Sequence, residues 1–254
     1  EGALLHTPYG ATEALPVASI AHPEILGETA ARTAAGEGVC VGRPVEGVEV
    51  RVIRVEDGEI PRFTPDLEVP AGTTGEFVVR GPQVTRGYFG RPEADLLTKI
   101  GDPAGGFWHR MGDLGYRDAS GRLWFCGRRS QRVRTEGGDL CADQCEGVFN
   151  AHPMVRRSAV VGVGEAGRQR PVAVIERARG GPHLREGEPE GPRDPVDDGR
   201  LAEEVLALGS SAPCTRGIRD VLLYRGILPV DTRHNAKIRR EVLAAWAAKR
   251  LGRA

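Results

Sequence analysis

Short runs of alternating apolar and polar residues, separated by glycine and proline turns, fill the first half of the chain and predict antiparallel β-strands. The alternation is clearest at residues 48–55, which are followed by the Asp57-Gly58 turn and by a proline-rich loop at 61–70. Further strands are predicted at residues 39–41, 75–80 and 122–126. We therefore expect the first half to be mostly β structure.

The pattern changes after Gly127, where helical spacing and strands begin to alternate. Helices are predicted at residues 143–150, 200–208 and 238–251, and strands at residues 158–163, 171–176, 221–224 and 227–228. The last helix is expected to bury Val242, Leu243, Trp246 and Leu251. Residues 180–199 are rich in glycine, proline and charge, which predicts a mobile loop. This order of elements predicts a compact α+β subdomain.

Charge and composition narrow the class of protein. Lys plus Arg and Asp plus Glu both number 35, so no net field recruits nucleic acid or an anionic membrane. No apolar run approaches the ~20 residues that cross a bilayer, and the first residues do not resemble a secretory signal. The five cysteines, an odd count, predict reduced thiols in the cytoplasm. Because the chain starts without Met in an apolar stretch, we expect it to be a fragment.

The first cluster of candidate functional residues is the segment 7–13, which reads Thr-Pro-Tyr-Gly-Ala-Thr-Glu. Tyr9 could stack on a base, Gly10 would form a turn, and the Thr12 hydroxyl could bind a phosphate. Glu13 could hold a Mg²⁺ ion that bridges phosphates. The same residues also suit a plain β-turn leading into a helix, and the physics of this segment alone favours that reading.

Two further clusters precede the change of pattern. Residues 108–116 place Asp113 between a glycine and a leucine, where its carboxylate could accept hydrogen bonds from two ribose hydroxyls or simply form a turn. Residues 127–132, with Arg128 directly after Gly127, could be an interdomain hinge or an ordinary linker.

The last cluster, residues 231–240, is polar and precedes the final helix. Lys237 lies in it and is one of only three lysines, with Lys99 and Lys249, in a chain whose basic residues are otherwise arginine. A lysine suits a pocket that holds a phosphate and a carboxylate. Cations at a helix N-terminus oppose the helix dipole, which favours a functional role for Lys237 over a structural one.

Two other motifs are set aside. Residues 162–167 match a dinucleotide-binding glycine pattern, but a new strand rather than a helix follows, so a strand-to-strand turn is predicted. Cys141 and Cys145 lie four residues apart, and with only His152 nearby they do not make a convincing metal site.

The clusters occur in the order, and at about the separations, of the late core motifs of the adenylate-forming superfamily, which includes acyl-CoA synthetases, luciferases and nonribosomal adenylation domains. Residues 9–13 resemble its Y-G-x-T-E motif and residues 112–114 its G-D-L motif. Gly127-Arg128 resembles the hinge motif, and residues 235–238 the G-K-I motif. The resemblance implies the α/β and α+β fold of these enzymes. Residues 1–127 would be the C-terminal portion of the large AMP-binding domain, and residues 128–254 the small mobile lid domain.

The resemblance also implies a role for each matching residue, with ATP and Mg²⁺ as cofactors. Tyr9, with Gly10, would stack on adenine, and Asp113 would bind the ribose with Arg128 beside it. The implied contact of Thr12 is the α-phosphate, and that of Glu13 is Mg²⁺. Lys237 would touch both the substrate carboxylate and the α-phosphate.

The amino-acid sequence of residues 9–17 and 233–238 is similar to that of the olefin-pathway β-lactone synthetases (OleC type), which are often labelled fatty-acid CoA ligases. This similarity implies adenylation of a β-hydroxy fatty acid followed by β-lactone formation without coenzyme A, with olefin-pathway enzymes as partners. Ser130 and Glu136 depart from the usual acyl-CoA synthetase pattern and favour lactone formation. Ala236 replaces the usual glycine before Lys237.

Two alternatives stay open. One is an ordinary fatty acyl-CoA ligase that forms a thioester with coenzyme A, because it would share every adenylation residue. The other is an inactive truncated fragment, since the glycine-rich phosphate loop and most of the acyl pocket belong upstream of these motifs in the family. We expect this chain alone not to catalyse the complete reaction.

Overall fold

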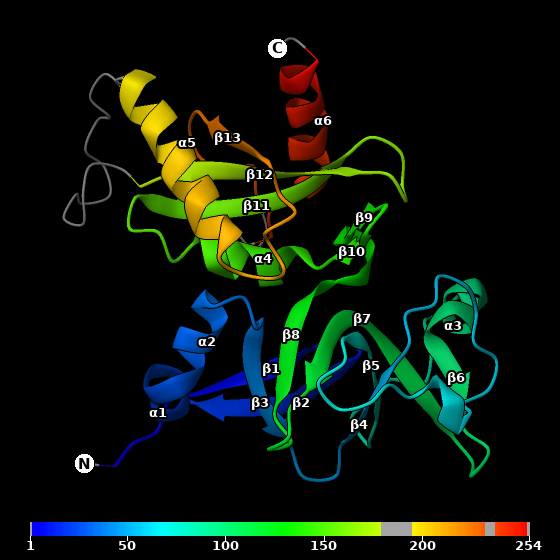
Figure 1. Cartoon of the computed structure of the whole chain (residues 1–254). Helices are drawn as coiled ribbons and strands as arrows, with labels where there is room; N and C mark the ends of the chain where they lie inside the picture. Colours follow the sequence, from blue (N-terminus) through cyan, green and yellow to red (C-terminus); the bar gives the residue numbers. More distant parts are fainter. Residues whose placement is uncertain (1, 179–194, 232–236, 253–254) are drawn as a thin grey trace. The chain divides into compact units, whose positions relative to one another are not determined.

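The computed structural model describes residues 2–178, 195–231 and 237–252. The chain forms two compact units (Figure 1). The first unit comprises Glu1–Ala31 and Gly38–Ser130, and the second comprises Arg32–Glu37 and Gln131–Ala254. No helix in these described ranges is long and apolar enough to cross a membrane.

The first unit is built on one antiparallel sheet with the strand order β1-β2-β3-β8-β7-β5-β4, and β6 pairs with β7 at its side. The strands are β1 (His6–Ala11), β2 (Ala14–Ala21), β3 (Val39–Pro44), β4 (Glu49–Ile53), β5 (Gly75–Arg80), β6 (Lys99–Gly101), β7 (Phe107–Arg117) and β8 (Leu123–Arg128). The helical segments are α1 (His22–Glu24), a π-helical turn (Ile25–Thr29), α2 (Ala30–Ala34), a 3-10 turn (Pro65–Leu67) and α3 (Pro92–Thr98).

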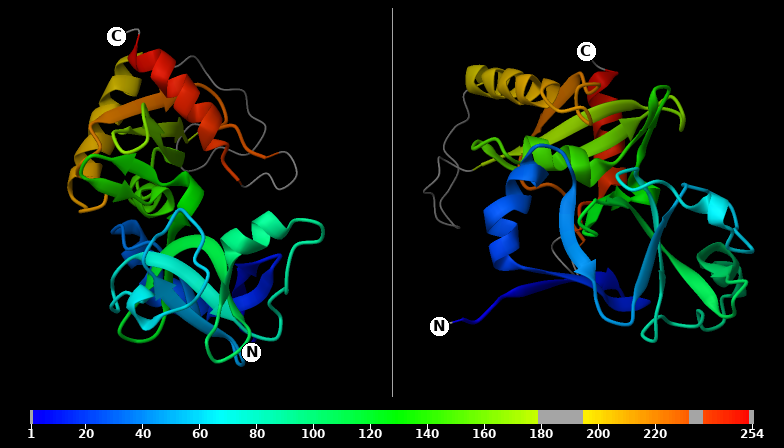
Figure 2. Two further views of the ribbon diagram at one scale, coloured as in Figure 1. Left: turned by 90° about the vertical axis from the view of Figure 1, so that its right-hand side faces the viewer. Right: turned by 60° about the horizontal axis from the view of Figure 1, so that its bottom comes forward.

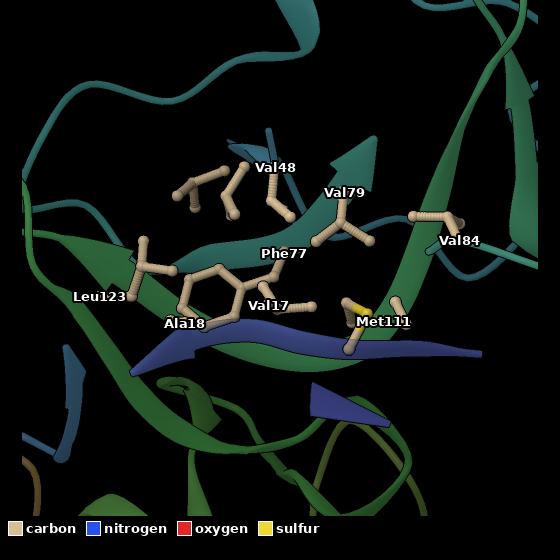
Figure 3. Close-up of a cluster of buried hydrophobic side chains, with 11 residues drawn as sticks. Val17, Ala18, Val48, Phe77, Val79, Val84, Met111 and Leu123 are labelled. Carbon is tan, nitrogen blue, oxygen red and sulfur yellow. The ribbon is translucent and has the colours of Figure 1, made fainter. Parts of the chain in front are cut away.

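This sheet curls around an apolar core (Figure 3). Val17 and Ala18 of β2 share one buried cluster with Val50 of β4, although these strands lie near opposite ends of the strand order. Phe77 of β5 and Leu123 of β8 fill the space between them. The sheet is therefore curved, so that side chains from strands near its two ends pack in the same core.

The second unit packs helices on both faces of a small sheet, β11-β12-β13 (Figure 2). Val160 and Ala173 face α4 and α5 in one buried cluster, while Ala159 and Val172 face α6 in another. The bounds are β9 (Val133–Thr135), β10 (Gly138–Leu140), α4 (Ala142–Phe149), β11 (Val155–Val163), β12 (Arg170–Arg177), α5 (Pro195–Ser210), β13 (Asp220–Tyr224) and α6 (Arg240–Leu251); a 3-10 turn (Arg129–Gln131) precedes β9.

Most predicted elements are confirmed, and the differences have local causes. Residues 227–228 are not a strand: the backbone N–H of Leu228 donates to the buried Glu176 carboxylate instead of to a sheet ladder. Residues 195–199 belong to α5, so the loop prediction is wrong there, and its remainder (180–194) lies outside the described residues. Val242 is on the exposed side of α6, whose buried contacts are Leu243 and Ala247. Residues 162–167 do form the predicted strand-to-strand turn.

A buried ion pair lies within the first unit. Arg110 and Glu76 are almost fully buried, and Arg110 Nη2 lies 2.6 Å from Glu76 Oε2. Arg110 Nη1 also donates to the Gly58 carbonyl at 2.7 Å, which holds the loop after β4 against the sheet. Glu76 Oε1 is buried without a hydrogen-bond partner among the described residues, so this carboxylate depends heavily on Arg110.

Replacing Arg110 with Met should destabilise the first unit by about 3 kcal/mol, because the buried Glu76 carboxylate loses its closest counter-charge. Arg129, whose Nη1 lies 3.5 Å from Glu76 Oε2, would be the only guanidinium left beside it among the described residues. The measurement is equilibrium urea unfolding followed by the fluorescence of Trp108 and Trp124, in a Trp246→Phe background. The exposed Arg91, which pairs with Glu93 at 3.3 Å, provides the control: Arg91→Met should leave the midpoint unchanged. Equal effects of the two substitutions would contradict the assigned importance of the buried pair.

Candidate functional site

Three of the predicted site residues meet in the first unit. Asp113 of β7 and Arg128 of β8 are directly opposite each other in the antiparallel ladder, and Arg128 Nη1 lies 2.8 Å from Asp113 Oδ1. The Tyr9 hydroxyl donates to Asp113 Oδ2 at 2.6 Å. We call Tyr9, Asp113 and Arg128 the β7 cluster. The strands thus join residues that are 104 positions apart in the sequence.

The position of Asp113 depends on an irregularity in β7. Opposite β5, the register moves from Val78↔Arg110 to Glu76↔Leu114, so β7 contains extra residues between these pairs. Gly112 takes a φ of +66°, a left-handed conformation that favours glycine. Bulges of this kind redirect a side chain locally, and here the bulge sets where the Asp113 carboxylate points.

Tyr9 is both a packing residue and a hydrogen-bond donor. Its ring centroid lies 6.2 Å from that of Phe77, edge to face, and 6.3 Å from that of Phe125. Burial, together with the Asp113 carboxylate beside its hydroxyl, raises the pKa of Tyr9 well above its ordinary value. Tyr9 therefore stays protonated at neutral pH and keeps donating to Asp113.

Gly10 is not the turn that the sequence predicted. It lies in β1, and a Cβ atom there would be 2.4 Å from the Ala14 carbonyl oxygen, so glycine is required by the close approach of two strands. The turn is formed instead by Thr12 and Glu13, between β1 and β2, and no helix follows at once. Thr12 is exposed at the tip of this turn.

Glu13 is held by Tyr88, a residue outside the sequence motifs. The Tyr88 hydroxyl donates to Glu13 Oε1 at 2.8 Å, and the Thr85 N–H donates to the Glu13 carbonyl at 2.8 Å. Partial burial works to raise the pKa of Glu13, but the Tyr88 hydrogen bond, a backbone hydrogen bond and the nearby Lys99 ammonium outweigh it and hold this pKa below its ordinary value. Glu13 is therefore a carboxylate at neutral pH.

His109 and Lys99 lie on the neighbouring strands β7 and β6, where they are directly paired. Burial, with a contribution from Lys99, lowers the pKa of His109 to about 4, so its ring is neutral at pH 7. Burial also lowers the pKa of Lys99, whose ammonium donates to the Thr85 carbonyl. These residues surround Glu13 with polar groups, and only the scarcity of lysine drew attention to Lys99 in the sequence.

Lys237 lies in the second unit and is exposed. It borders an open hollow of about 330 Å³ together with Asp231, Arg239 and Glu241. The Asp231 N–H donates to the Lys237 carbonyl at 2.9 Å, which fixes the backbone at this position. The structure therefore collects Tyr9, Asp113 and Arg128 in one cluster, places Glu13 with Tyr88, and presents Lys237 on a separate unit.

Removing only the Tyr9 hydroxyl tests the β7 cluster. Tyr9→Phe should lower the free energy of unfolding by about 1–2 kcal/mol, because the buried Asp113 carboxylate loses a donor while the ring packing is kept. Urea unfolding in the absence of nucleotide measures this change. Tyr224→Phe is the control, since the Tyr224 hydroxyl has no hydrogen bond to any described residue and its ring packs on Trp246. A loss no larger than that of the control would refute the hydrogen bond.

Comparison with known proteins identifies relatives with the same motifs. Residues 2–89 match the family model of AMP-binding enzymes. The chain is 46% identical over 250 residues to the olefin β-lactone synthetase of Xanthomonas campestris pv. campestris and 43% identical over 249 residues to that of Stenotrophomonas maltophilia; each alignment covers 96% of this chain and 42% of the relative. It is also 30% identical over 179 residues, or 69% of this chain and 28% of the relative, to a long-chain-fatty-acid–CoA ligase of Escherichia coli. The chain thus spans less than half the length of these curated relatives.

Solved structures with the same fold include the amide bond synthetase McbA of Marinactinospora thermotolerans, at a TM-score of 0.68 and 27% identity over 96% of this chain and 42% of that one. The ATP-bound MatB of Rhodopseudomonas palustris aligns at a TM-score of 0.66 and 25% identity, over 96% of this chain and 41% of that one. These neighbours confirm the predicted mixed α/β and α+β fold class. The sequence motifs, the family match and the structural neighbours agree, and the chain belongs to the AMP-binding family of adenylate-forming enzymes.

Proposed function

We propose that the full-length protein activates a fatty acid, in particular a β-hydroxy acid, as its acyl-AMP with ATP and releases pyrophosphate, and that it then forms a β-lactone. The observation that carries this proposal is the 46% identity, across 96% of the chain, to a protein named olefin β-lactone synthetase. The β7 cluster supports it, because Tyr9, Asp113 and Arg128, which come from three of the resembling motifs, are in contact.

The β7 cluster is proposed to bind the nucleoside. The Asp113 carboxylate, held by Tyr9 and Arg128, accepts hydrogen bonds from the ribose hydroxyls, and Arg128 supplies positive charge beside it. The Tyr9 ring is proposed to stack on adenine. Thr12, exposed at the turn, donates its hydroxyl to the α-phosphate.

Glu13 is proposed to hold the Mg²⁺ ion. Its carboxylate is charged at neutral pH, and its Oε1 is held by the Tyr88 hydroxyl. Carboxylate oxygens are the protein ligands that Mg²⁺ prefers, so this residue fits the ion. When bound, Mg²⁺ would neutralise charge on the phosphates. Tyr88 would orient the Glu13 carboxylate through its hydrogen bond.

Lys237 is proposed to act in the adenylation step itself. A carboxylate oxygen of the acid attacks the α-phosphorus, the bond to pyrophosphate breaks, and pyrophosphate leaves with the electron pair. The ammonium of Lys237 stabilises the negative charge on the carboxylate and the α-phosphate as they approach. In this proposal residues 1–127 contribute to the large AMP-binding domain, and residues 128–254 are the mobile lid that carries Lys237.

Lactone formation is the second proposed step. The β-hydroxyl oxygen of the acyl-AMP attacks the carbonyl carbon of the same molecule, the hydroxyl proton is lost, and AMP leaves with the electrons of the broken C–O bond. Because both reacting groups belong to one acyl-AMP molecule, the protein needs only to hold its acyl chain in a folded conformation that brings the β-hydroxyl close to the carbonyl carbon. We place this chemistry in the cytoplasm, with olefin-pathway enzymes as partners.

The alternative is a fatty acyl-CoA ligase, in which the thiol of coenzyme A attacks the same acyl-AMP. The 30% identity to the long-chain-fatty-acid–CoA ligase favours this alternative, and every residue discussed above would serve it equally. The two functions differ only in the nucleophile of the second step.

A product assay on the full-length protein separates them. We expect ATP, Mg²⁺ and a long-chain β-hydroxy acid to give a β-lactone and AMP without coenzyme A. A thioester formed only when coenzyme A is present would establish the ligase instead. Absence of pyrophosphate release under both conditions would reject adenylation altogether.

Substitution of Lys237 tests the division of labour between nucleotide binding and chemistry. Lys237→Ala should lower the rate of acyl-AMP formation by about 10²–10³-fold, because a charge that stabilises the transition state is lost. The Kd for ATP should stay within about threefold of the wild-type value, since the proposed adenine and ribose contacts are made elsewhere. Pyrophosphate exchange measures the first quantity and equilibrium dialysis the second.

The complementary variant is Asp113→Asn. It should weaken ATP binding by about tenfold, since a neutral amide is a poorer acceptor for two hydroxyls than a carboxylate. If Lys237→Ala weakened ATP binding as much as Asp113→Asn does, the proposed assignment of Lys237 to the chemical step would be wrong.

A further inference from the structure

In the second unit, the backbone of residues 229–231 is paired with that of residues 237–239. Val230 and Ile238 form an isolated antiparallel bridge. We call residues 229–231 and 237–239, which include Lys237, the Lys237 base, in the sense of the backbone that supports this side chain. A paired base restricts the backbone from which the lysine side chain extends.

The C-terminal side of the Lys237 base is held by Arg240, the first residue of α6. Arg240 Nη2 lies 2.7 Å from Glu146 Oε2, and Arg240 Nε lies 3.1 Å from Glu146 Oε1. Glu146 belongs to α4, is 6% exposed, and also accepts the Val160 N–H at 2.8 Å. Two donors of one guanidinium on one carboxylate fix orientation as well as distance.

Arg240 has a third contact that points to the start of the second unit. Its Nη1 donates to Gln131 Oε1 at 2.7 Å, and Gln131 is the first residue of that unit after Ser130. Asp143 adds a weaker contact, with Oδ1 at 3.4 Å from Arg240 Nη2. One side chain therefore connects the segment that follows Lys237 to α4 and to the beginning of the unit.

The N-terminal side of the Lys237 base is held by a second buried carboxylate. Glu176 of β12 accepts the Leu228 N–H at 2.8 Å through Oε2 and contacts Arg156 Nη1 at 2.9 Å through Oε1. Residues 229–231 follow directly. The base thus lies between two fixed points, Leu228 and Arg240, each attached to a carboxylate on the α4–sheet core.

We infer that Arg240 is a positioning residue, which through its fork to Glu146 and its hydrogen bond to Gln131 sets the place of Lys237 for adenylation. This inference rests on the role of Lys237 proposed above. Arg240 itself contacts neither ATP nor the acid in this scheme. Its effect is geometric, and a displacement of about 1 Å at a catalytic group can cost on the order of 10²-fold in rate.

Loss of the guanidinium need not unfold the unit, because Glu146 can take up a proton. Burial raises the pKa of Glu146 to about 7, and Arg240 opposes this rise. In Arg240→Met this opposition to the rise in pKa is removed, so Glu146 becomes neutral more readily, which limits the unpaired charge left in the buried site. The variant is therefore suited to functional measurement.

Hydrogen exchange tests the geometry without any need for activity. In Arg240→Met the Asp231 and Arg239 amides, which donate to the Lys237 and Pro229 carbonyls, should exchange at least about tenfold faster. The amides of β12 should keep their rates, because the core of the unit is intact. Unchanged exchange at 231 and 239, or an equal rise throughout β12, would overturn the positioning role.

A double-mutant cycle tests the consequence for catalysis in the full-length protein. Arg240→Met should slow acyl-AMP formation by about 10- to 100-fold with wild-type Lys237, and by less than about twofold in a Lys237→Ala background. Arg240→Lys should recover part of the rate, since it keeps the charge beside Glu146 but cannot fork to Glu146 and Gln131 together. A loss of equal size in both backgrounds would show a purely structural role.

The control is Arg200→Met, which removes an arginine from an exposed ion pair with Glu204 on α5 of the same unit. It should alter neither the exchange rates nor the catalytic rate. If the wild-type protein forms no acyl-AMP, the proposed function fails, while the exchange experiment still decides whether Arg240 holds the Lys237 base.

Discussion

Buried carboxylates must be paired, and this constraint shapes both units. Glu76, Asp113, Glu146 and Glu176 are all nearly inaccessible to water, and each meets an arginine. Such pairs add little net stability, because desolvation offsets attraction, but they permit only a few geometries. The buried ion pairs therefore restrict how strands and loops that are distant in sequence can pack against each other. In Asp113 the same requirement leaves a charged acceptor fixed in place, with the half-exposed Arg128 beside it.

The pattern of apolar residues was sufficient to predict most of the expected sheet and helix elements, because strands such as β5 and β12 each contain a continuous apolar run that is buried. It failed where backbone groups are satisfied by side chains. Leu228 looks like part of a strand, yet its N–H is taken by Glu176. The strands β1 and β2 were missed because their pairing depends on the close approach at Gly10, which no local pattern reveals.

Some residues of the candidate site could likewise be predicted from the sequence, and others could not. Tyr9, Asp113 and Arg128 could be named from motif order, and the structure brings them together, although their roles stay proposals. Tyr88 and His109 could not be named, because their relation to Glu13 arises from packing between β7 and the segment before α3. Arg240 lies at the end of the polar cluster 231–240, but the role proposed for it rests on its contact with Glu146, 94 residues away.

Nearly all basic residues of this chain are arginines, and the three lysines differ from them in geometry and flexibility. Arginine forms fixed, forked contacts, as Arg240 does with Glu146 and Arg110 with Glu76. Lysine is a compact charge on a flexible stem, and it can follow a phosphate and a carboxylate as they change position during a reaction. An exposed lysine whose neighbouring arginine is rigidly held combines these properties: the backbone is fixed and the charge is mobile. The second unit has both kinds of cation close together in the sequence: Lys237 is exposed, and Arg240 is held by Glu146 and Gln131.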